Sequence, residues 1–398
     1  MDTITFIVQA SSRNWSGSKD ICMDLLKGHP VVYWVMKRIM DEIPSAKIIL
    51  AAPLFDKGGA LDDIIQELNS PKVAVFYGSD FDPLNRILAC TDNLDDDDYI
   101  VRIDGIHYFV DLNTSLKMLK QAAVKHLDCV KLPDGWPTYF TSDIYRIGAL
   151  RKLNSILNAE EEQIYRIHPK YYLFHNKNFR CEYAEELPEY ADDYLLECRA
   201  LFQDTRNEER IEVNEDKYWA GCQLSFHYEL AMTYIKDWMK VLDIACGDGY
   251  GTRILAQRCR EIYGADIDKN IIAYNRENLS DMNIRYDIED VTNLSYQDNE
   301  FDAITSMETL EHVNVQKYFE ELYRVLKPGG ILIISTPQNL LGRIPITPAH
   351  LREYSMDELK NLCGTYFKIE KFIGIKQGRI IFPNDPYGNN SMAICSKR

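Results

Sequence analysis

The chain has 398 residues, of which 46% are hydrophobic and 27% charged, and this length predicts two globular domains instead of one core. The formal net charge of −16 argues against a nucleic-acid partner, because neutralising phosphates requires a basic surface. The sequence shows neither an apolar run long enough for a membrane span nor a signal peptide, and its ten cysteines form no CxxC pairs. We therefore expect a cytoplasmic protein with reduced thiols and no membrane partner.

Two regions alternate short apolar strands with amphipathic helices, a pattern typical of α/β domains built on parallel strands. The first region reaches about Phe174, and residues 1–178 are expected to form an N-terminal domain. The acidic stretch 179–215 lacks strand signals and is expected to be a helical connector. The alternation resumes at Val241, so residues 216–398 are expected to form a second α/β domain.

The N-terminal domain carries polar groups where predicted strands end. A Ser/Gly-rich loop with Arg13 and Lys19 follows the first strand, and its N–H groups and side-chain charges suit a phosphate chain. A later strand ends in VRIDGIHYFVD, where Asp104, His107 and Asp111 cluster. Carboxylates at a strand end predict a metal or phosphate site.

The order of these blocks resembles the cytidylyltransferases of the spore-coat-polysaccharide and acidic-sugar type. The resemblance rests on the GHP helix start at 28–30, the block from Gly78 to Arg86, and the late Arg166-x-His168-Pro169. It implies an α/β nucleotidyltransferase (glycosyltransferase A-like) fold that transfers CMP from CTP with Mg²⁺ held by carboxylates. The residues that it implies for nucleotide binding are Arg13, Lys19, Asp82, Arg86 and Arg102, and those for the metal are Asp104 and Asp143.

The chain also departs from that family. Arg13 and Lys19 are further apart than in the family's Arg-Leu-Pro-x-Lys loop, and Ile106 occupies the position of its metal-binding aspartate. Asp104 could replace that aspartate only if the loop follows a different path, and Asp143 is expected at the position of the second metal carboxylate. A magnesium ion with one protein carboxylate and otherwise water ligands also fits, because Mg²⁺ keeps several waters. Two hypotheses stand: an active cytidylyltransferase, and a degenerate domain that binds a substrate or a partner.

The strongest signal is VLDIACGDGYGTRILA, a hydrophobic strand followed by a glycine-rich turn and a helix. Gly247, Gly249 and Gly251 allow a tight turn and the close approach of a ligand. A second strand, EIYGAD, ends in Asp266 about twenty residues later, at the position where a ribose diol is bound in related folds. METLEHV and LKPGGILIISTP follow further along the chain.

This series of motifs resembles the class I S-adenosylmethionine (SAM) dependent methyltransferases over essentially all of 216–398. It implies a Rossmann-like, doubly wound sheet of seven strands with SAM above its carboxyl edge. By resemblance, the methionine part of SAM is lined by Asp243, Ala245, Gly247 and Gly249. The ribose is bound by Asp266, the adenine by Ile267, Asp290 and Val291, and the region of the methyl group by Glu308.

The acceptor site is expected around METLEHV and the later TPAHLREYS. Glu311, His312 and His350 are the candidate catalytic residues, with one histidine as general base. In ubiquinone-type O-methyltransferases and small-RNA 2′-O-methyltransferases a similar pattern holds a divalent ion, here implying Glu308, Glu311, His312 and His350 as ligands. A substrate-contacting loop and a packed histidine fit the same residues.

Tyr218, Trp219 and His227 precede the first strand of this domain, either as a cap over SAM or as core residues. The whole pattern predicts a two-domain enzyme that methylates O or N of a small acceptor, sugar-linked, nucleotide-linked or phosphorylated. Two alternatives stay open: a bifunctional CTP-dependent cytidylyltransferase/methyltransferase in surface-polysaccharide precursor synthesis, and a methyltransferase with a non-catalytic N-terminal binding module. The oligomeric state, a homo-oligomer included, is also open.

Overall fold

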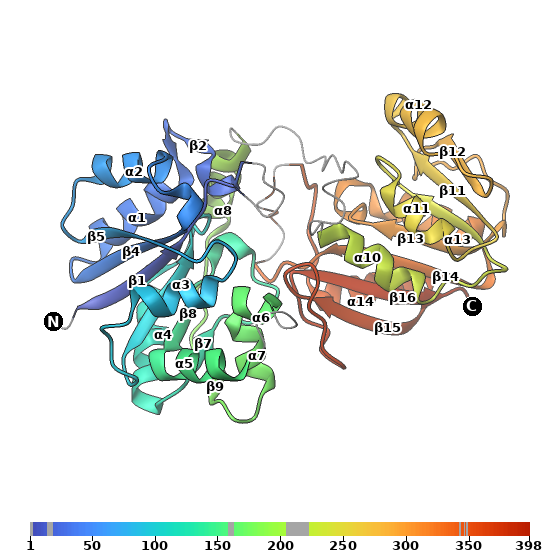
Figure 1. Cartoon of the computed structure of the whole chain (residues 1–398). Coiled ribbons are helices and arrows are strands. Elements are labelled where there is room, and N and C mark those ends of the chain that lie inside the picture. Colours follow the sequence, from blue (N-terminus) through green and yellow to red (C-terminus); the bar gives the residue numbers. More distant parts are fainter. Residues whose placement is uncertain are drawn as a thin grey trace. The chain divides into compact units, whose positions relative to one another are not determined.

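The computed structural model describes residues 3–13, 19–157, 163–203, 223–341, 344–345, 347 and 349–398. The chain divides into two compact units (Figure 1). Unit 1 comprises Met1–Pro133 and Thr138–Ala191, and unit 2 comprises Asp134–Pro137 and Asp192–Arg398. The first unit therefore extends beyond residue 178, where the sequence pattern placed its end. Among the described residues, no helix combines the length and apolar character that a membrane crossing needs.

Unit 1 is built on a seven-stranded sheet of order β5-β4-β1-β6-β8-β7-β9. In that order the strands are Val73–Gly78, Ala46–Pro53, Ile4–Gln9, Tyr99–Asp104, Asp143–Arg146, Cys129–Lys131 and Cys181–Tyr183. The four strands from β5 to β6 are parallel, β8 is antiparallel to both β6 and β7, and β9 is parallel to β7. The α/β architecture predicted for this region is confirmed.

The helices of unit 1 follow the predicted alternation. They are α1 (Val31–Glu42), α2 (Ala60–Leu68), α3 (Pro83–Cys90), α4 (Leu112–Lys125), α5 (Ile147–Ile156), α6 (Gln163–Ile167) and α7 (Pro169–His175). A short hairpin is formed by β2 (Leu25–Leu26) and β3 (His29–Pro30), and 3-10 turns lie at Ile21–Met23, Leu54–Asp56 and Thr138–Phe140. Asp111 caps α4 by accepting from the backbone N–H of Asn113 at 2.9 Å, so this carboxylate has a local structural role.

The expected helical connector begins with a strand. β9 (Cys181–Tyr183) pairs in parallel with β7 and extends the first sheet. A strand of three residues is too short for an alternating pattern, and its conformation depends on hydrogen bonds to a distant segment. The helical part of the connector starts later, at α8 (Asp192–Gln203), which belongs to unit 2.

Unit 2 contains a second seven-stranded sheet, of order β12-β11-β10-β13-β14-β16-β15. In that order the strands are Ile284–Ile288, Glu261–Asp266, Lys240–Ile244, Phe301–Met307, Leu326–Pro337, Asn390–Ser396 and Lys368–Ile375. Its helices after α8 are α10 (Gln223–Met232), α11 (Tyr250–Ala256), α12 (Lys269–Asn278), α13 (Val315–Val325) and α14 (Met356–Tyr366), with a 3-10 turn at Leu310–His312. In this order the strands from β12 to β14, with β11, β10 and β13 between them, are parallel, and β16 is antiparallel to both its neighbours. The predicted Rossmann-like sheet of seven strands is confirmed.

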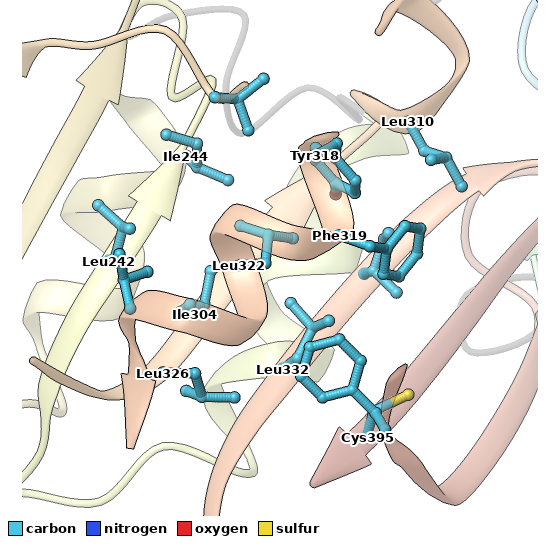
Figure 2. Close-up of a cluster of buried hydrophobic side chains, with 14 of the residues drawn as sticks. Leu242, Ile244, Ile304, Leu310, Tyr318, Phe319, Leu322, Leu326, Leu332 and Cys395 are labelled. Atoms are coloured by element: carbon cyan, nitrogen blue, oxygen red, sulfur yellow. The ribbon is translucent and has the colours of Figure 1, made fainter. Parts of the chain in front are cut away.

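The strand order reverses between β10 and β13, which are neighbours in the sheet although α11, β11, α12 and β12 lie between them in sequence. Ligands bind at such reversal points in open α/β sheets because the two following loops diverge there. Helix α13 packs Tyr318, Phe319 and Leu322 against the sheet, and none of the three side chains is exposed (Figure 2). This core holds the strand ends on which the candidate site is built.

Candidate functional site

The glycine-rich turn of unit 2 connects β10 to α11. Its backbone is left-handed at Ala245 (φ 56°), Gly247 (φ 54°) and Gly249 (φ 76°). A Cβ at Gly249 would lie 2.7 Å from the Tyr286 hydroxyl, whereas a Cβ at Gly247 would have nothing within 4 Å. The turn therefore presents bare backbone at Gly247, as the close approach of a ligand requires.

Asp243 lies inside the sheet below this turn and has no exposed surface. Its carboxylate accepts hydrogen bonds from Thr252 Oγ1 at 2.6 Å and from Thr305 Oγ1 at 2.8 Å. Burial raises the pKa of Asp243 to about 6 despite these donors. The side chain thus joins α11 to β13 and offers no exposed oxygen to a cofactor.

Asp266 ends β11 and supports the turn from the neighbouring strand. One of its oxygens accepts from the backbone N–H of Gly247 at 3.0 Å, and the other accepts from that of Asp268 at 2.9 Å. Ile267 is 65% exposed and provides an apolar surface next to this carboxylate. A carboxylate beside an exposed apolar side chain is the combination that a ribose attached to a flat base would need.

Asp290 and Val291 follow β12 at the same edge of the sheet. Thr292 donates to the Asp290 carboxylate from its hydroxyl at 2.7 Å and from its backbone N–H at 2.8 Å, and these bonds lower the pKa of Asp290. Asp290 is exposed, whereas Val291 is buried. The carboxylate is therefore an ionised acceptor at the surface.

Glu308 follows β13 and has a left-handed backbone, with φ at 51°. Its Oε1 accepts from Ser335 Oγ at 2.8 Å, and its Oε2 accepts from Asn390 Nδ2 at 2.7 Å. His227 Nδ1, from α10, lies 3.0 Å from Ser335 Oγ and 3.5 Å from Glu308 Oε1. Burial lowers the pKa of His227 to about 4, so the ring is neutral at pH 7. This network connects one carboxylate to side chains of three other elements.

Sequence reasoning missed Ser335 and Asn390 as members of this network. Ser335 stands within an apolar strand and Asn390 begins β16, so no local spacing connects either residue to Glu308. The sequence does not decide whether His227 covers a cofactor or packs in the core, and the structure places it in the buried network. Tyr218 and Trp219 lie outside the described residues.

Glu311, His312 and His350 come together, with one candidate ligand atom from each lying within 4.8 Å of the others. His312 Nδ1 lies 3.1 Å from the carbonyl oxygen of Ala349, and His350 Nδ1 lies 2.6 Å from Glu353 Oε1. A carbonyl and a carboxylate only accept hydrogen bonds, so Nδ1 carries the proton in both rings. When these rings are neutral, their lone pairs are therefore on Nε2.

Glu311 completes this cluster from a buried position, with 1% of its surface exposed. Its Oε2 accepts from Thr336 Oγ1 at 2.9 Å, while its Oε1 is buried and has no hydrogen-bond partner among the described residues. Burial and the nearby Glu308 carboxylate raise the pKa of Glu311 well above its usual range. Glu308 is not a member of the cluster, and both its oxygens accept hydrogen bonds from other side chains.

In unit 1, Arg102 occupies the centre of the predicted metal site. Its guanidinium lies 2.6 Å from Asp104 and 3.1 Å from Asp143, and it also donates to Gln9. Lys170 Nζ lies 3.0 Å from the second oxygen of Asp143. Although burial acts in the opposite direction, Lys170 and Arg102 lower the pKa of Asp143 to about 2. These carboxylates are already neutralised by side-chain cations, and such a donor set does not fit Mg²⁺.

The other predicted nucleotide ligands in this unit also have protein partners. Asp82 lies 2.6 Å from Arg166 and caps α3. Arg86 donates to the Ser79 carbonyl at 2.8 Å, and burial lowers its pKa. Its Nε is buried without a hydrogen-bond partner among the described residues. Arg86 is thus the member of this set with a buried, unused donor.

Arg13 and Lys19 flank the first loop, whose residues 14–18 lie outside the described ranges. Arg13 is exposed, and Lys19 Nζ lies 2.9 Å from Asp24. His107, in the polar stretch after β6, lies 3.6 Å from Asp104, and burial lowers its pKa to about 4. It is therefore a neutral, buried ring at pH 7.

Comparisons with known proteins bear on unit 2. Residues 242–334 match the family model described as a methyltransferase domain. The chain is 33% identical over 144 residues to a probable S-adenosylmethionine-dependent methyltransferase of Mycolicibacterium smegmatis, covering 35% of this chain and 55% of that protein. It is 36% identical over 99 residues to a ubiquinone biosynthesis O-methyltransferase of Coxiella burnetii, covering 24% of this chain and 42% of that protein. A crystal structure of a SAM-dependent methyltransferase from Methanosarcina mazei is similar over 42% of this chain and 96% of that one, with 19% identity and a TM-score of 0.33.

The chain spans about half the length of the curated relatives it matches. Unit 2 contains a methyltransferase domain that resembles the class I SAM-dependent methyltransferases, as its motifs predicted. The match to the family model lies within unit 2, at residues 242–334.

Proposed function

We propose that unit 2 transfers the methyl group of SAM to an oxygen or nitrogen of a small acceptor. The observation that carries this proposal is the adjacency of β10 and β13 at the point where the strand order reverses. The glycine turn leaves one of these strands, and the segment from Glu308 to His312 leaves the other. A cofactor turn and a cluster of acid–base side chains therefore start from neighbouring strand ends.

For the cofactor, we propose that the bare backbone at Gly247 receives the amino-acid part, while Ala245 and Gly249 shape the turn. Asp266 would accept from the ribose hydroxyls and Ile267 would contact the adenine, with Asp290 and Val291 at its edge. Asp243 would hold the turn from below, since its carboxylate is buried. When bound, SAM supplies an electrophilic methyl group on a sulfonium, and the chain's task is to align an acceptor with it.

For the acceptor, we propose that His312 or His350 removes the proton from the attacking hydroxyl or amine. Both rings direct Nδ1–H toward the protein, which leaves Nε2 as the basic atom. Glu311, which clusters with both rings and has an Oε1 without a hydrogen-bond partner among the described residues, also fits a divalent cation, which would lower the pKa of an acceptor hydroxyl. Mg²⁺ is a hard ion that prefers oxygen ligands, so two imidazoles favour Zn²⁺, Mn²⁺ or Co²⁺ in this cluster.

The test is direct binding of SAM by calorimetry, followed by release of S-adenosylhomocysteine with a panel of small hydroxyl and amine acceptors. We expect Asp266→Asn to weaken SAM binding and His350→Gln to leave SAM binding intact while reducing turnover. Chelation with EDTA followed by addition of single metals separates the base from the metal-assisted form of the proposal. Absence of SAM binding to the intact chain would refute it.

For unit 1, we propose a non-catalytic module that binds a small ligand, in preference to a cytidylyltransferase. The contacts of Arg102 and Lys170 with Asp104 and Asp143 support this choice, because they occupy the carboxylates that Mg²⁺ would require. Pyrophosphate release from CTP, with and without Mg²⁺, tests it. Turnover would instead support the bifunctional enzyme.

The panel of methyl acceptors tested with unit 2 includes sugar- or nucleotide-linked compounds and phosphorylated metabolites, since the fusion of the two domains suggests them.

A further inference from the structure

Arg199 stands on α8, ahead of the methyltransferase motifs, in the stretch that was expected to be a connector. One guanidinium nitrogen, Nη1, donates to the carbonyl oxygens of Pro345 at 2.8 Å and Thr347 at 3.2 Å. The other, Nη2, donates to the carbonyl oxygen of His350 at 2.9 Å. A single side chain therefore binds three backbone carbonyls of the loop that carries a candidate catalytic histidine.

The same loop orients the second histidine. The carbonyl of Ala349 accepts from His312 Nδ1 at 3.1 Å, and this carbonyl lies between the Thr347 and His350 carbonyls in the chain. On the far side of His350, the backbone N–H of Leu351 donates to the carbonyl of Glu311 at 2.8 Å. Each member of the cluster thus either belongs to this loop or hydrogen-bonds to its described residues.

From these contacts we infer that Arg199 is a positioning residue for the acceptor site. It holds the loop so that His312 and His350 keep Nδ1–H directed at the Ala349 carbonyl and at Glu353, which leaves the lone pair of each neutral ring on Nε2. The inference rests on the proposed function for its meaning in catalysis. Its contacts and its effect on the two rings are independent of which acceptor or metal the site uses.

The chemistry of arginine explains why this position suits it. The guanidinium is planar, is charged at all physiological pH values and has several N–H donors in a fixed arrangement, so it can satisfy three separated carbonyls at once. A lysine ammonium carries the same charge on a compact group and cannot match the span between Pro345 and His350 in the same way. Arg199→Lys is therefore a variant that keeps the charge and removes the geometry.

The experiment uses the full chain with ¹⁵N-labelled histidine, because ring nitrogen shifts report which nitrogen carries the proton. Wild type, Arg199→Lys and Arg199→Ala are compared, and His312→Gln and His350→Gln assign the signals. The matched control is Arg324→Ala. Arg324 also donates to two backbone carbonyls, those of Tyr296 at 2.7 Å and Leu294 at 2.9 Å, but it does so at the far end of α13.

We expect the neutral rings of His312 and His350 to carry the proton on Nδ1 in wild type and in Arg324→Ala. In both Arg199 variants, we expect the His312 ring to shift toward a mixture of Nδ1–H and Nε2–H tautomers. The reason is that the loop no longer holds the Ala349 carbonyl, which accepts from Nδ1–H, in place. Unchanged tautomers in the Arg199 variants would overturn the inference, and so would an equal change in Arg324→Ala, which would indicate general loosening. Calorimetric SAM binding, measured in parallel, tests the proposed function separately: failure of wild type to bind SAM refutes that proposal and leaves the tautomer result to judge this one.

Discussion

Replacing Asp243 with asparagine should change how the stability of unit 2 depends on pH. The carboxyl is fully buried, and its pKa is about 6 in the folded protein against an ordinary value of 3.8. Because the folded pKa is the higher one, protonation favours folding. The resulting stability is fully present below pH 3.8 and is lost as the pH rises through 6.

The size of this effect follows from the difference between the two pKa values. At about 1.36 kcal/mol for each pH unit, a rise from 3.8 to about 6 corresponds to about 3 kcal/mol. Asparagine does not titrate in this range. The free energy of unfolding of Asp243→Asn, relative to wild type, should therefore improve by up to about 3 kcal/mol between pH 4 and pH 7.

Hydrogen exchange measured by mass spectrometry suits this test, because peptides from β10 and β13 report on unit 2 alone. The variant and wild type are compared at each pH, so the intrinsic pH dependence of exchange cancels. Thr252→Val serves as a second variant: it removes a donor at 2.6 Å from Asp243, raises the pKa of that carboxyl further and should steepen the loss toward pH 7. Parallel stability curves for wild type and Asp243→Asn would refute the reasoning.

Three further predictions concern two glycines of unit 2 and one buried histidine of unit 1. Gly251→Ala places a Cβ 2.1 Å from the ring of Tyr228, so we expect a loss of about 1–3 kcal/mol in stability and weaker SAM binding, measured by melting and calorimetry. Gly364→Ala is the contrasting case: this exposed site in α14 has no atom closer than 4.0 Å, and alanine should stabilise the helix by about 0.5–1 kcal/mol; a lower melting temperature would contradict this. In unit 1, burial lowers the pKa of His107 to about 4, so the stability that its neutral ring contributes is present above pH 6.5 and is lost as the pH falls toward 4. The loss amounts to about 3 kcal/mol, and His107→Gln should remove it, as judged by exchange of β6 peptides at pH 7 and pH 4.5.

The sequence by itself determined the architecture of the methyltransferase domain. A strand, a glycine turn and a helix are local patterns, because backbone freedom at Gly247 and Gly249 and apolar runs such as VLDI depend on neighbouring residues in the chain. The same holds for Asp266 at the end of its strand, since the length of the connecting helix sets how many residues separate the ends of two adjacent parallel strands.

Only the tertiary structure decided how the acidic side chains are used. Asp243 and Asp266 look alike in the sequence, yet one is enclosed by threonine hydroxyls inside the sheet and the other ends a strand beside an exposed isoleucine. In unit 1, VRIDGIHYFVD suggested a metal site, but Arg102 binds both Asp104 and the distant Asp143. These outcomes depend on contacts between segments far apart in the chain, as does the binding of the His350 loop by Arg199. Burial and long-range pairing determine the charge of a carboxylate and which of its oxygens are available, and the neighbouring residues in the sequence predict neither property.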